Sequence, residues 1–295
     1  MTPANLSFLA AMLTLPLVLS LDLHALDVVK LPKPQSTKDI RFIHKNEVLR
    51  AALELTKEEF GPYEIHFNAP IMKRSRALEA MKSGDLINVY FSPPKKLWAE
   101  NTIVIDVPIR RGVLSYRLLL VHKNDLELFS KINTANDLKK LKAGLQHGWS
   151  TTDALDKSGF DYVKAYNFDG LFYMLESHRF NYLPRGVHEV FDELDARRDE
   201  LKNVVIEPSL ALYLPAPTYT YVSPREPRLA QRIEMGMKMM VNNGLMKDIF
   251  DKYYLDDLKK AKLHERKIID VGSDLEDNSK ILEMKELWFD FDEGR

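Results

Sequence analysis

The stretch from residue 143 to residue 207 constrains the fold most, because short apolar runs alternate there with segments of helical periodicity. Four runs have the composition of β-strands: 143–147, 162–167, 180–185 and 203–207. Three segments between them have the apolar spacing of helices: 151–157, 169–177 and 187–198. Strands that alternate with helices of this length indicate a parallel sheet. The pattern therefore predicts an α/β fold.

Polar, aromatic and cationic residues follow these predicted strands. In an open parallel sheet the ligand binds beyond the carboxyl ends of the strands. The candidate ligand contacts at these ends are Trp149, Thr151, Thr152, Asp153, Asn167 and Arg185. Residues 148–153 also open a helix, where free backbone N–H groups and the helix dipole attract an anion. Helix capping by Ser150 explains the same turn without a ligand, and Trp149 is either a ligand contact or a core aromatic.

Length and composition exclude several classes of protein. The 295 residues, 45% of them hydrophobic, favour two domains. A net charge of −1 provides no field that would attract nucleic acid, and no cysteine is present for disulfides or thiolate sites. We found no metal-binding histidine spacing, glycine-rich phosphate loop or serine elbow. The sequence thus predicts no metal, no cofactor, no nucleic-acid partner and no enzymatic activity.

The amino terminus predicts export. Residues 6–21 are apolar and uncharged, and Leu23, His24 and Ala25 form a rough small-residue cleavage pattern. We interpret residues 1–25 as a signal peptide, so that the mature protein begins near Leu26 in the periplasm. Because no Lys or Arg precedes the apolar run, a retained anchor helix or a buried helix is the alternative.

The remaining pattern predicts two lobes. Lobe 1 comprises 26–113 and a return segment at 217–267, lobe 2 comprises 114–216, and 268–295 is an irregular acidic tail in which Trp288 and Phe289 are expected to dock onto a lobe. The strands predicted in lobe 1 are 40–44, 63–68 and 87–91, and its helices are 46–60, 74–82, 229–241 and 246–261. Extended runs at 103–108 and 210–222 bracket lobe 2, as two crossovers between lobes would.

The order of these elements, with short motifs at 112–120, 148–149, 169–175 and 179–187, resembles the type II periplasmic solute-binding proteins of family 3, the receptors of amino-acid uptake systems. The resemblance covers roughly residues 40–262. It implies a two-lobed fold in which each lobe is a mixed or parallel sheet flanked by helices and two crossover strands join the lobes. It also implies a monomer that binds a small molecule and works with a membrane permease or a sensor.

The family's charged ligand contacts have changed in this chain. Where the family has an arginine for the ligand carboxylate, this sequence has Lys95 or Lys96, which hold an anion without the planar fork or are simply solvated. Where the family has an acidic residue for the ligand ammonium, this sequence has Arg185, either a ligand contact or part of a salt bridge across the cleft. The acidic partners available for such a bridge are Asp106, Asp153, Asp169 and Glu189. Arg110, in the first crossover, is also expected to face the cleft.

The sequence therefore predicts an exported solute-binding protein for a small polar, anionic molecule, amino acid-like or carboxylate. Its lobes are expected to close by hinge motion near residues 111–116 and 215–221. One alternative is a periplasmic sensor module that signals to a membrane partner. Another is a cleft enzyme such as a dehydratase, since a few members of this superfamily are dehydratases.

Overall fold

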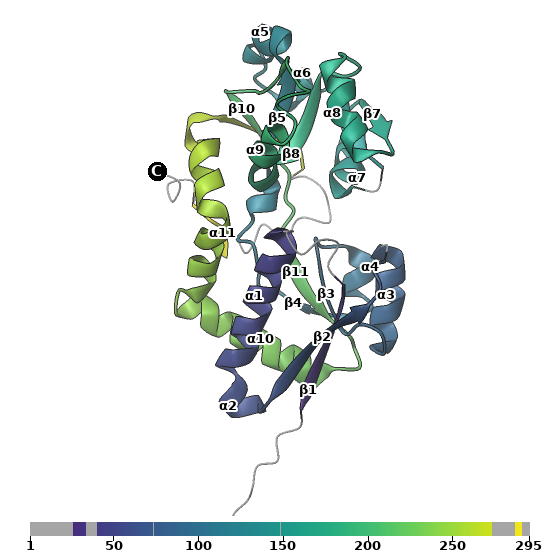
Figure 1. Ribbon diagram of the computed structural model, residues 1–295, viewed down its shortest axis with the longest axis vertical. Coiled ribbons are helices and arrows are strands. Elements are labelled where there is room, and N and C mark those ends of the chain that lie inside the picture. The colour runs from purple at the N-terminus through teal and green to yellow at the C-terminus, as the bar shows by residue number, and fades with distance from the viewer. Residues whose placement is uncertain (1–25, 34–39, 73, 148, 273–286, 291–295) are drawn as a thin grey trace, which may run out of the picture.

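The computed structural model describes residues 26–33, 40–72, 74–147, 149–272 and 287–290, and it forms two lobes stacked along the long axis of the molecule (Figure 1). The predicted signal peptide at residues 1–25 lies outside the described residues. Within the described part of the chain, no helix is long and apolar enough to cross a membrane.

Lobe 1 contains two small sheets covered by helices. In one sheet β1 (Asp27–Pro32) pairs in parallel with β2 (Tyr63–Ala69). In the other, β11 (Tyr219–Val222) lies between β3 (Val89–Ser92) and β4 (Ile103–Ile105) and is antiparallel to both. The helices of this lobe are α1 (Ile40–Leu55), α2 (Lys57–Phe60), α3 (Arg74–Ser83), α4 (Lys96–Ala99) and α10 (Pro227–Asn242).

Lobe 2 is built on one mixed sheet with the strand order β12-β10-β5-β8-β6-β7, and β9 pairs with β5 outside this path. These strands are β5 (Tyr116–His122), β6 (Ala143–Gln146), β7 (Tyr162–Ala165), β8 (Tyr182–Gly186), β9 (Val204–Ile206), β10 (Leu210–Tyr213) and β12 (Lys267–Asp270). Its helices include α5 (Leu126–Ser130), α6 (Ala135–Leu138), α7 (Ser150–Lys157), α8 (Phe168–Glu176) and α9 (Val187–Asp195). The described residues also form three short 3₁₀ turns: η1 (Val113–Ser115), η2 (Lys123–Asp125) and η3 (Leu263–Glu265).

Most predicted elements are present, but one strand assignment and the direction of another strand were wrong. Residues 40–44 belong to α1, where His44 and Val48 lie one helical turn apart and are both fully buried. The first strand is instead β1, in which Val29 and Leu31 alternate into the core. In lobe 2, β6 is parallel to β7 and β8 as predicted, whereas β9 is antiparallel to β5.

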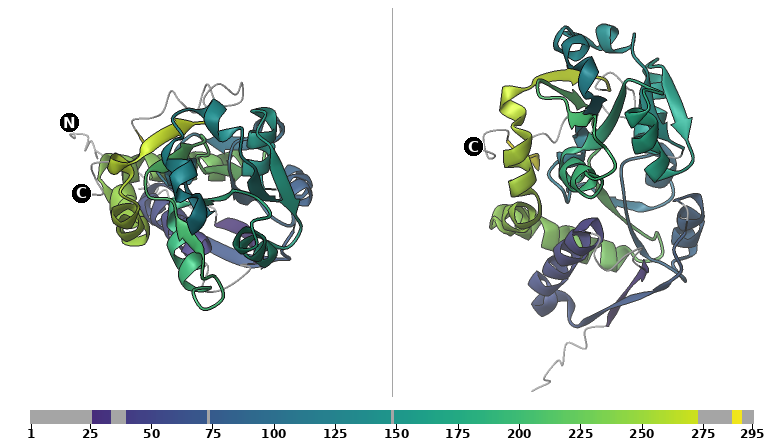
Figure 2. Two further views of the ribbon diagram at one scale, coloured as in Figure 1. Left: turned by 90° about the horizontal axis from the view of Figure 1, so that it is seen from above. Right: turned by 45° about the horizontal axis from the view of Figure 1, so that its top comes forward.

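Helix α11 (Leu245–Ala261) spans both lobes. Its Met246 and Ile249 pack into the core of lobe 1 with α1 and α10, whereas Phe250, Tyr254 and Leu258 pack into the core of lobe 2. Figure 2 shows α11 rising along one side of the molecule from α10 towards β12. The structure thus differs from the predicted return of residues 217–267 to lobe 1, since their carboxyl-terminal part belongs to both lobes.

The start of the predicted tail is also ordered. Residues Lys267–Asp270 form β12, which pairs in parallel with β10 in the sheet of lobe 2. The prediction that the chain becomes irregular from residue 268 was therefore wrong at its beginning. The predicted docking of Trp288 and Phe289 is confirmed, because each residue is only 7% exposed.

Candidate functional site

Two of the predicted site residues bridge the lobes. Lys95 follows β3 in lobe 1, and Asp153 lies in the first turn of α7 in lobe 2. The Nζ atom of Lys95 donates to Oδ2 of Asp153 at 3.1 Å. Their side chains are 41% and 56% exposed, so the pair contributes about 0–1 kcal/mol to stability. An ion pair this weak can exchange for a ligand at little cost.

Arg185, at the carboxyl end of β8, is held by carboxylates of its own lobe. Its Nε and Nη2 atoms donate to the two carboxylate oxygens of Glu193, each at 2.6 Å, and Nη2 lies 2.9 Å from Oε2 of Glu189. Burial alone would lower the pKa of Arg185, but Glu189 and Glu193 raise it above its usual value. Arg185 thus forms a salt bridge, which was one of its two predicted roles. The bridge lies inside lobe 2 and not across the cleft, and its bidentate partner is Glu193.

The aromatic and polar candidates near Arg185 also have partners within lobe 2. The guanidinium of Arg185 lies 4.6 Å from the ring centre of Trp149, a favourable cation–π distance. The hydroxyl of Thr152 donates to the carbonyl oxygen of Gln146 at 2.8 Å. The side chain of Asn167 caps α8 by accepting from the backbone N–H of Asp169 at 2.9 Å. The predicted alternative for Trp149 agrees with its packing against the core of lobe 2. The predicted capping by Ser150 does not, because Trp149 takes the N-cap position of α7 and makes no side-chain cap hydrogen bond.

The remaining two candidates in this region differ in exposure. Thr151 is buried in the first turn of α7, with 6% of its surface exposed. The side chain of Lys96 is 79% exposed, and its Nζ atom lies 4.0 Å from Oε1 of Glu100 in the next helical turn. Lys96 thus has the surroundings of a solvated residue.

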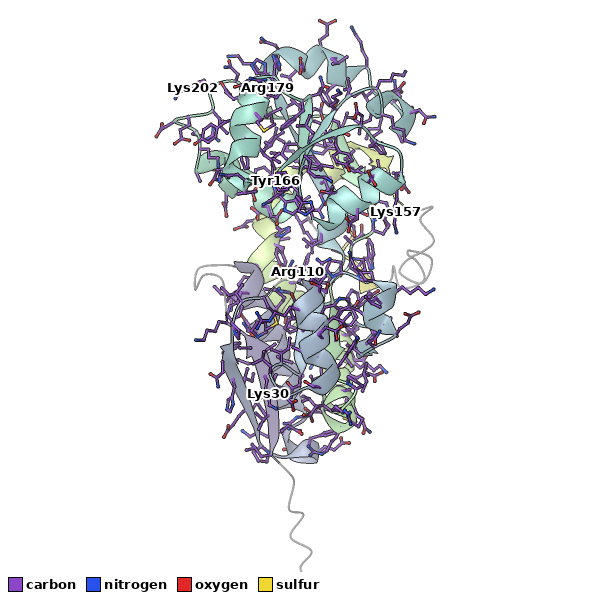
Figure 3. All side chains as sticks on the ribbon, turned by 90° about the vertical axis from the view of Figure 1, so that its right-hand side faces the viewer. Lys30, Arg110, Lys157, Tyr166, Arg179 and Lys202 are labelled. Atoms are coloured by element: carbon purple, nitrogen blue, oxygen red, sulfur yellow. The ribbon has the colours of Figure 1, made fainter. Side chains whose placement is uncertain are left out.

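A second group of side chains lies where α1, the first crossover, α9 and α11 meet, which we call the lobe junction. Arg110 of the crossover is 4% exposed, His44 of α1 is fully buried, and His188 of α9 is 9% exposed. The Tyr254 ring of α11 lies between the two imidazoles, with ring centres 4.9 Å from His44 and 5.6 Å from His188. In Figure 3, Arg110 is seen at the lobe 1 side of the junction and Tyr166 on lobe 2 above it.

The electrostatic state of His44 is unusual. Burial, followed by the positive charges of Arg110 and Lys45 and by His188, holds the pKa of His44 well below its usual value. Neither ring nitrogen of His44 has a hydrogen-bond partner among the described residues. A buried polar group in this condition costs about 1–3 kcal/mol. The junction therefore combines positive charge with an imidazole that lacks an acceptor or donor.

His44 and His188 were not among the site residues predicted from the sequence. The available signal for His44 was its position one helical turn before the buried Val48, which places an imidazole on the apolar face of α1. Within the described residues, no cluster of three or more His, Asp or Glu side chains is arranged to hold a metal ion. The junction therefore brings together charged and polar side chains of both lobes.

The lowered pKa of His44 predicts a loss of stability in mild acid. Below about pH 6.5 the imidazole becomes protonated in the unfolded chain but stays neutral in the folded one, so the free energy of unfolding falls as pH falls. The slope due to this group is at most about 1.4 kcal/mol per pH unit. The free energy of unfolding can be measured by urea titration between pH 7 and pH 5, followed by circular dichroism. We expect it to depend less on pH in His44→Phe than in the wild type. An unchanged pH dependence in this variant would contradict a lowered pKa of His44. His66→Phe, on the exposed part of β2, is the matched control.

Comparison with known proteins rests on structure. No protein-family model matches the sequence, and no curated protein does. YckB of Bacillus subtilis superposes with a TM-score of 0.52 and 18% sequence identity, covering 83% of this chain and 96% of that one. An ancestral arginine-binding protein bound to arginine superposes with a TM-score of 0.50 and 18% identity, covering 78% of this chain and 96% of that one.

The chain has the two-lobed fold of the periplasmic binding proteins. The predicted fold class is confirmed. Several similar structures with this periplasmic-binding fold are amino-acid-binding proteins, at identities of 12% to 18%. A histidine kinase sensor domain is also similar, with a TM-score of 0.49 and 18% identity, covering 72% of this chain and 85% of that one. At these identities the likeness concerns the fold alone.

Proposed function

We propose that the protein is an exported solute-binding protein that encloses a small anionic molecule at the lobe junction. The observation that carries this proposal is His44, fully buried beside the positive charges of Arg110 and Lys45 and without a hydrogen-bond partner among the described residues. A carboxylate placed there would accept a hydrogen bond from the imidazole and interact favourably with both cations. The ligand would thus supply the hydrogen-bond partner that the buried His44 imidazole lacks among the described residues.

The positions around the junction support a ligand of small size. Arg110 belongs to the crossover, His44 to lobe 1 and His188 to lobe 2, so a single molecule can contact both lobes. Lys95 of lobe 1 and Asp153 of lobe 2 form a further, exposed ion pair between the lobes. Because Glu189 and Glu193 hold Arg185, we assign the contact with the anion to His44 and Arg110 in the first place.

The proposed ligand class follows from charge. The arginine of the similar ancestral protein carries a carboxylate and cationic groups. In this chain Lys45, Arg110 and His188 surround His44, and an added ligand cation would be repelled there. We therefore propose carboxylates without an amine, such as dicarboxylates or sugar acids. Delivery of the ligand to a membrane permease completes the uptake role, and turnover of a bound carboxylate would instead indicate a cleft enzyme.

A sensor role is the second candidate, favoured by α11. Because this helix packs into the cores of both lobes, it restricts the wide opening that release to a permease requires. A sensor needs only a small change in lobe angle. Co-purification of the protein with a permease or with a kinase would separate the two roles.

Ligand-induced stabilisation tests the proposed site. Residues 26–295 would be unfolded thermally with dicarboxylates, sugar acids and amino acids, and a ligand at a hundred times its Kd should add about 2.7 kcal/mol. We expect His44→Phe to fold, since it replaces an unpartnered polar ring by an apolar one, and to lose most of this gain. His66→Phe should retain it. A gain of full size in His44→Phe would refute the site, and stabilisation by amino acids alone would refute the ligand class.

A further inference from the structure

Trp288 and Phe289 lie in the seam between the lobes. Trp288 belongs to a core that contains Trp98 and Tyr221 of lobe 1 and Tyr213 of lobe 2, and its ring centre lies 6.0 Å from that of Tyr213. Phe289 packs in the core of lobe 2, where its ring centre lies 5.4 Å from Tyr116 and 6.1 Å from Phe250. Two adjacent residues thus insert their side chains into two different cores, one shared by both lobes and one within lobe 2.

The same dipeptide is bonded to the first crossover. The backbone N–H of Phe289 donates to the carbonyl oxygen of Arg111 at 2.9 Å. In return, Nη2 of Arg111 donates to the carbonyl oxygen of Trp288 at 3.3 Å. The guanidinium of Arg111 also lies 5.3 Å from the ring centre of Phe250 on α11. Arg111 is therefore held between the tail and the helix that spans both lobes.

The crossover has a strained backbone at this point. Arg111 has a φ of 43° and Gly112 a φ of 74°, both in the left-handed region, which is unfavourable for a residue other than glycine. The indole of Trp288 covers Gly112 so closely that a Cβ atom there would stand 2.4 Å from the ring. The tail contacts therefore stabilise a conformation that Arg111 would not adopt by itself.

We propose that Trp288 and Phe289 form a hinge wedge, which holds the first crossover in its left-handed conformation and thereby sets the angle between the lobes. The wedge belongs to cores that contain residues of both lobes and is hydrogen-bonded to the crossover, so displacing it frees the hinge on that side. The second crossover and α11 also join the lobes. The wedge therefore adds one further restraint on an interlobe angle that these two segments already limit. This inference goes beyond the proposed function and does not depend on which ligand binds.

Distance measurement between the lobes tests the wedge in the ligand-free full chain. Because the chain has no cysteine, spin labels would attach only to two introduced cysteines. We place these at two exposed positions, Arg76→Cys on α3 and Lys157→Cys on α7. With the wedge intact we expect one narrow distance distribution. Trp288→Ala and Phe289→Ala should each broaden it and add a second population. Tyr173→Ala, which removes a half-exposed ring on α8, is the control and should leave it narrow.

A second variant keeps the test valid if the alanine variants fold poorly. Gly112→Ala leaves the tail intact but forces the indole of Trp288 away, so it should broaden the distribution in the same manner. Gly112→Ala should also destabilise the wild type more than the Trp288→Ala variant, because only the backbone strain remains once the indole is absent. A narrow distribution in all three variants, or equal effects of Gly112→Ala in both backgrounds, would overturn the proposal.

Discussion

We expect Arg232→Met to lower the free energy of unfolding by about 3–5 kcal/mol, because it leaves one carboxylate oxygen of Asp27 and several carbonyl oxygens without their donor. The Arg232 side chain, on α10, is fully buried, and its Nη1 atom lies 2.7 Å from Oδ2 of Asp27 on β1. Its Nη2 atom donates to the carbonyl oxygens of Leu53 at 3.0 Å and of Gly61 at 2.8 Å. One guanidinium therefore ties α10 to β1, α1 and the turn before β2.

Urea unfolding followed by circular dichroism measures this effect, and two variants control it. Arg228→Met removes the other cation bonded to Asp27, but the Arg228 side chain is 40% exposed, so we expect a loss of only about 1 kcal/mol. Adding Asp27→Asn to Arg232→Met should recover part of the loss, since the buried charge is then absent. A loss as small as that of Arg228→Met would show that water replaces the guanidinium.

The second large effect is expected from Glu193→Leu, which leaves the buried guanidinium of Arg185 with Glu189 as its carboxylate partner. The Arg185 side chain is 7% exposed, and Glu193 supplies its two hydrogen bonds of 2.6 Å. We expect unfolding to become easier by about 3 kcal/mol. The same reasoning predicts that Arg185→Ala destabilises lobe 2 whether or not a ligand is present.

The control for Glu193→Leu is Glu127→Leu. Glu127 also forms an ion pair, with Lys131 at 2.8 Å, but its side chain is 85% exposed, so its loss should change stability by less than about 1 kcal/mol. The double variant Arg185→Met with Glu193→Leu should regain much of the lost stability, because the buried guanidinium and its bidentate partner are then both absent. If Glu193→Leu and Glu127→Leu have equal effects, the buried pair is not a source of stability.

Local periodicity was sufficient for the elements whose burial pattern is contained in their own residues. The strands β6, β7 and β8 and the helices α7, α8 and α9 begin and end close to the predicted residues, because short apolar runs alternate there with segments of helical spacing. The direction of a strand and the choice of its partner strand, in contrast, depend on residues outside that strand. Strand β9 has three residues and pairs with the last three residues of β5, Leu120 to His122. Nothing within such a short run specifies that the pairing is antiparallel.

For the candidate site, the sequence determined which groups require partners, and the tertiary structure determined which partners they have. A buried arginine after a strand must be paired, but its pairing with Glu193 depends on how the turn from β8 brings α9 back over the sheet. The junction of His44, Arg110 and His188 likewise exists only because α1, the crossover and α9 converge from distant parts of the chain. Side-chain chemistry is a local property of the sequence, whereas distance between charges is a property of the folded chain, and the energy of their interaction depends on that distance.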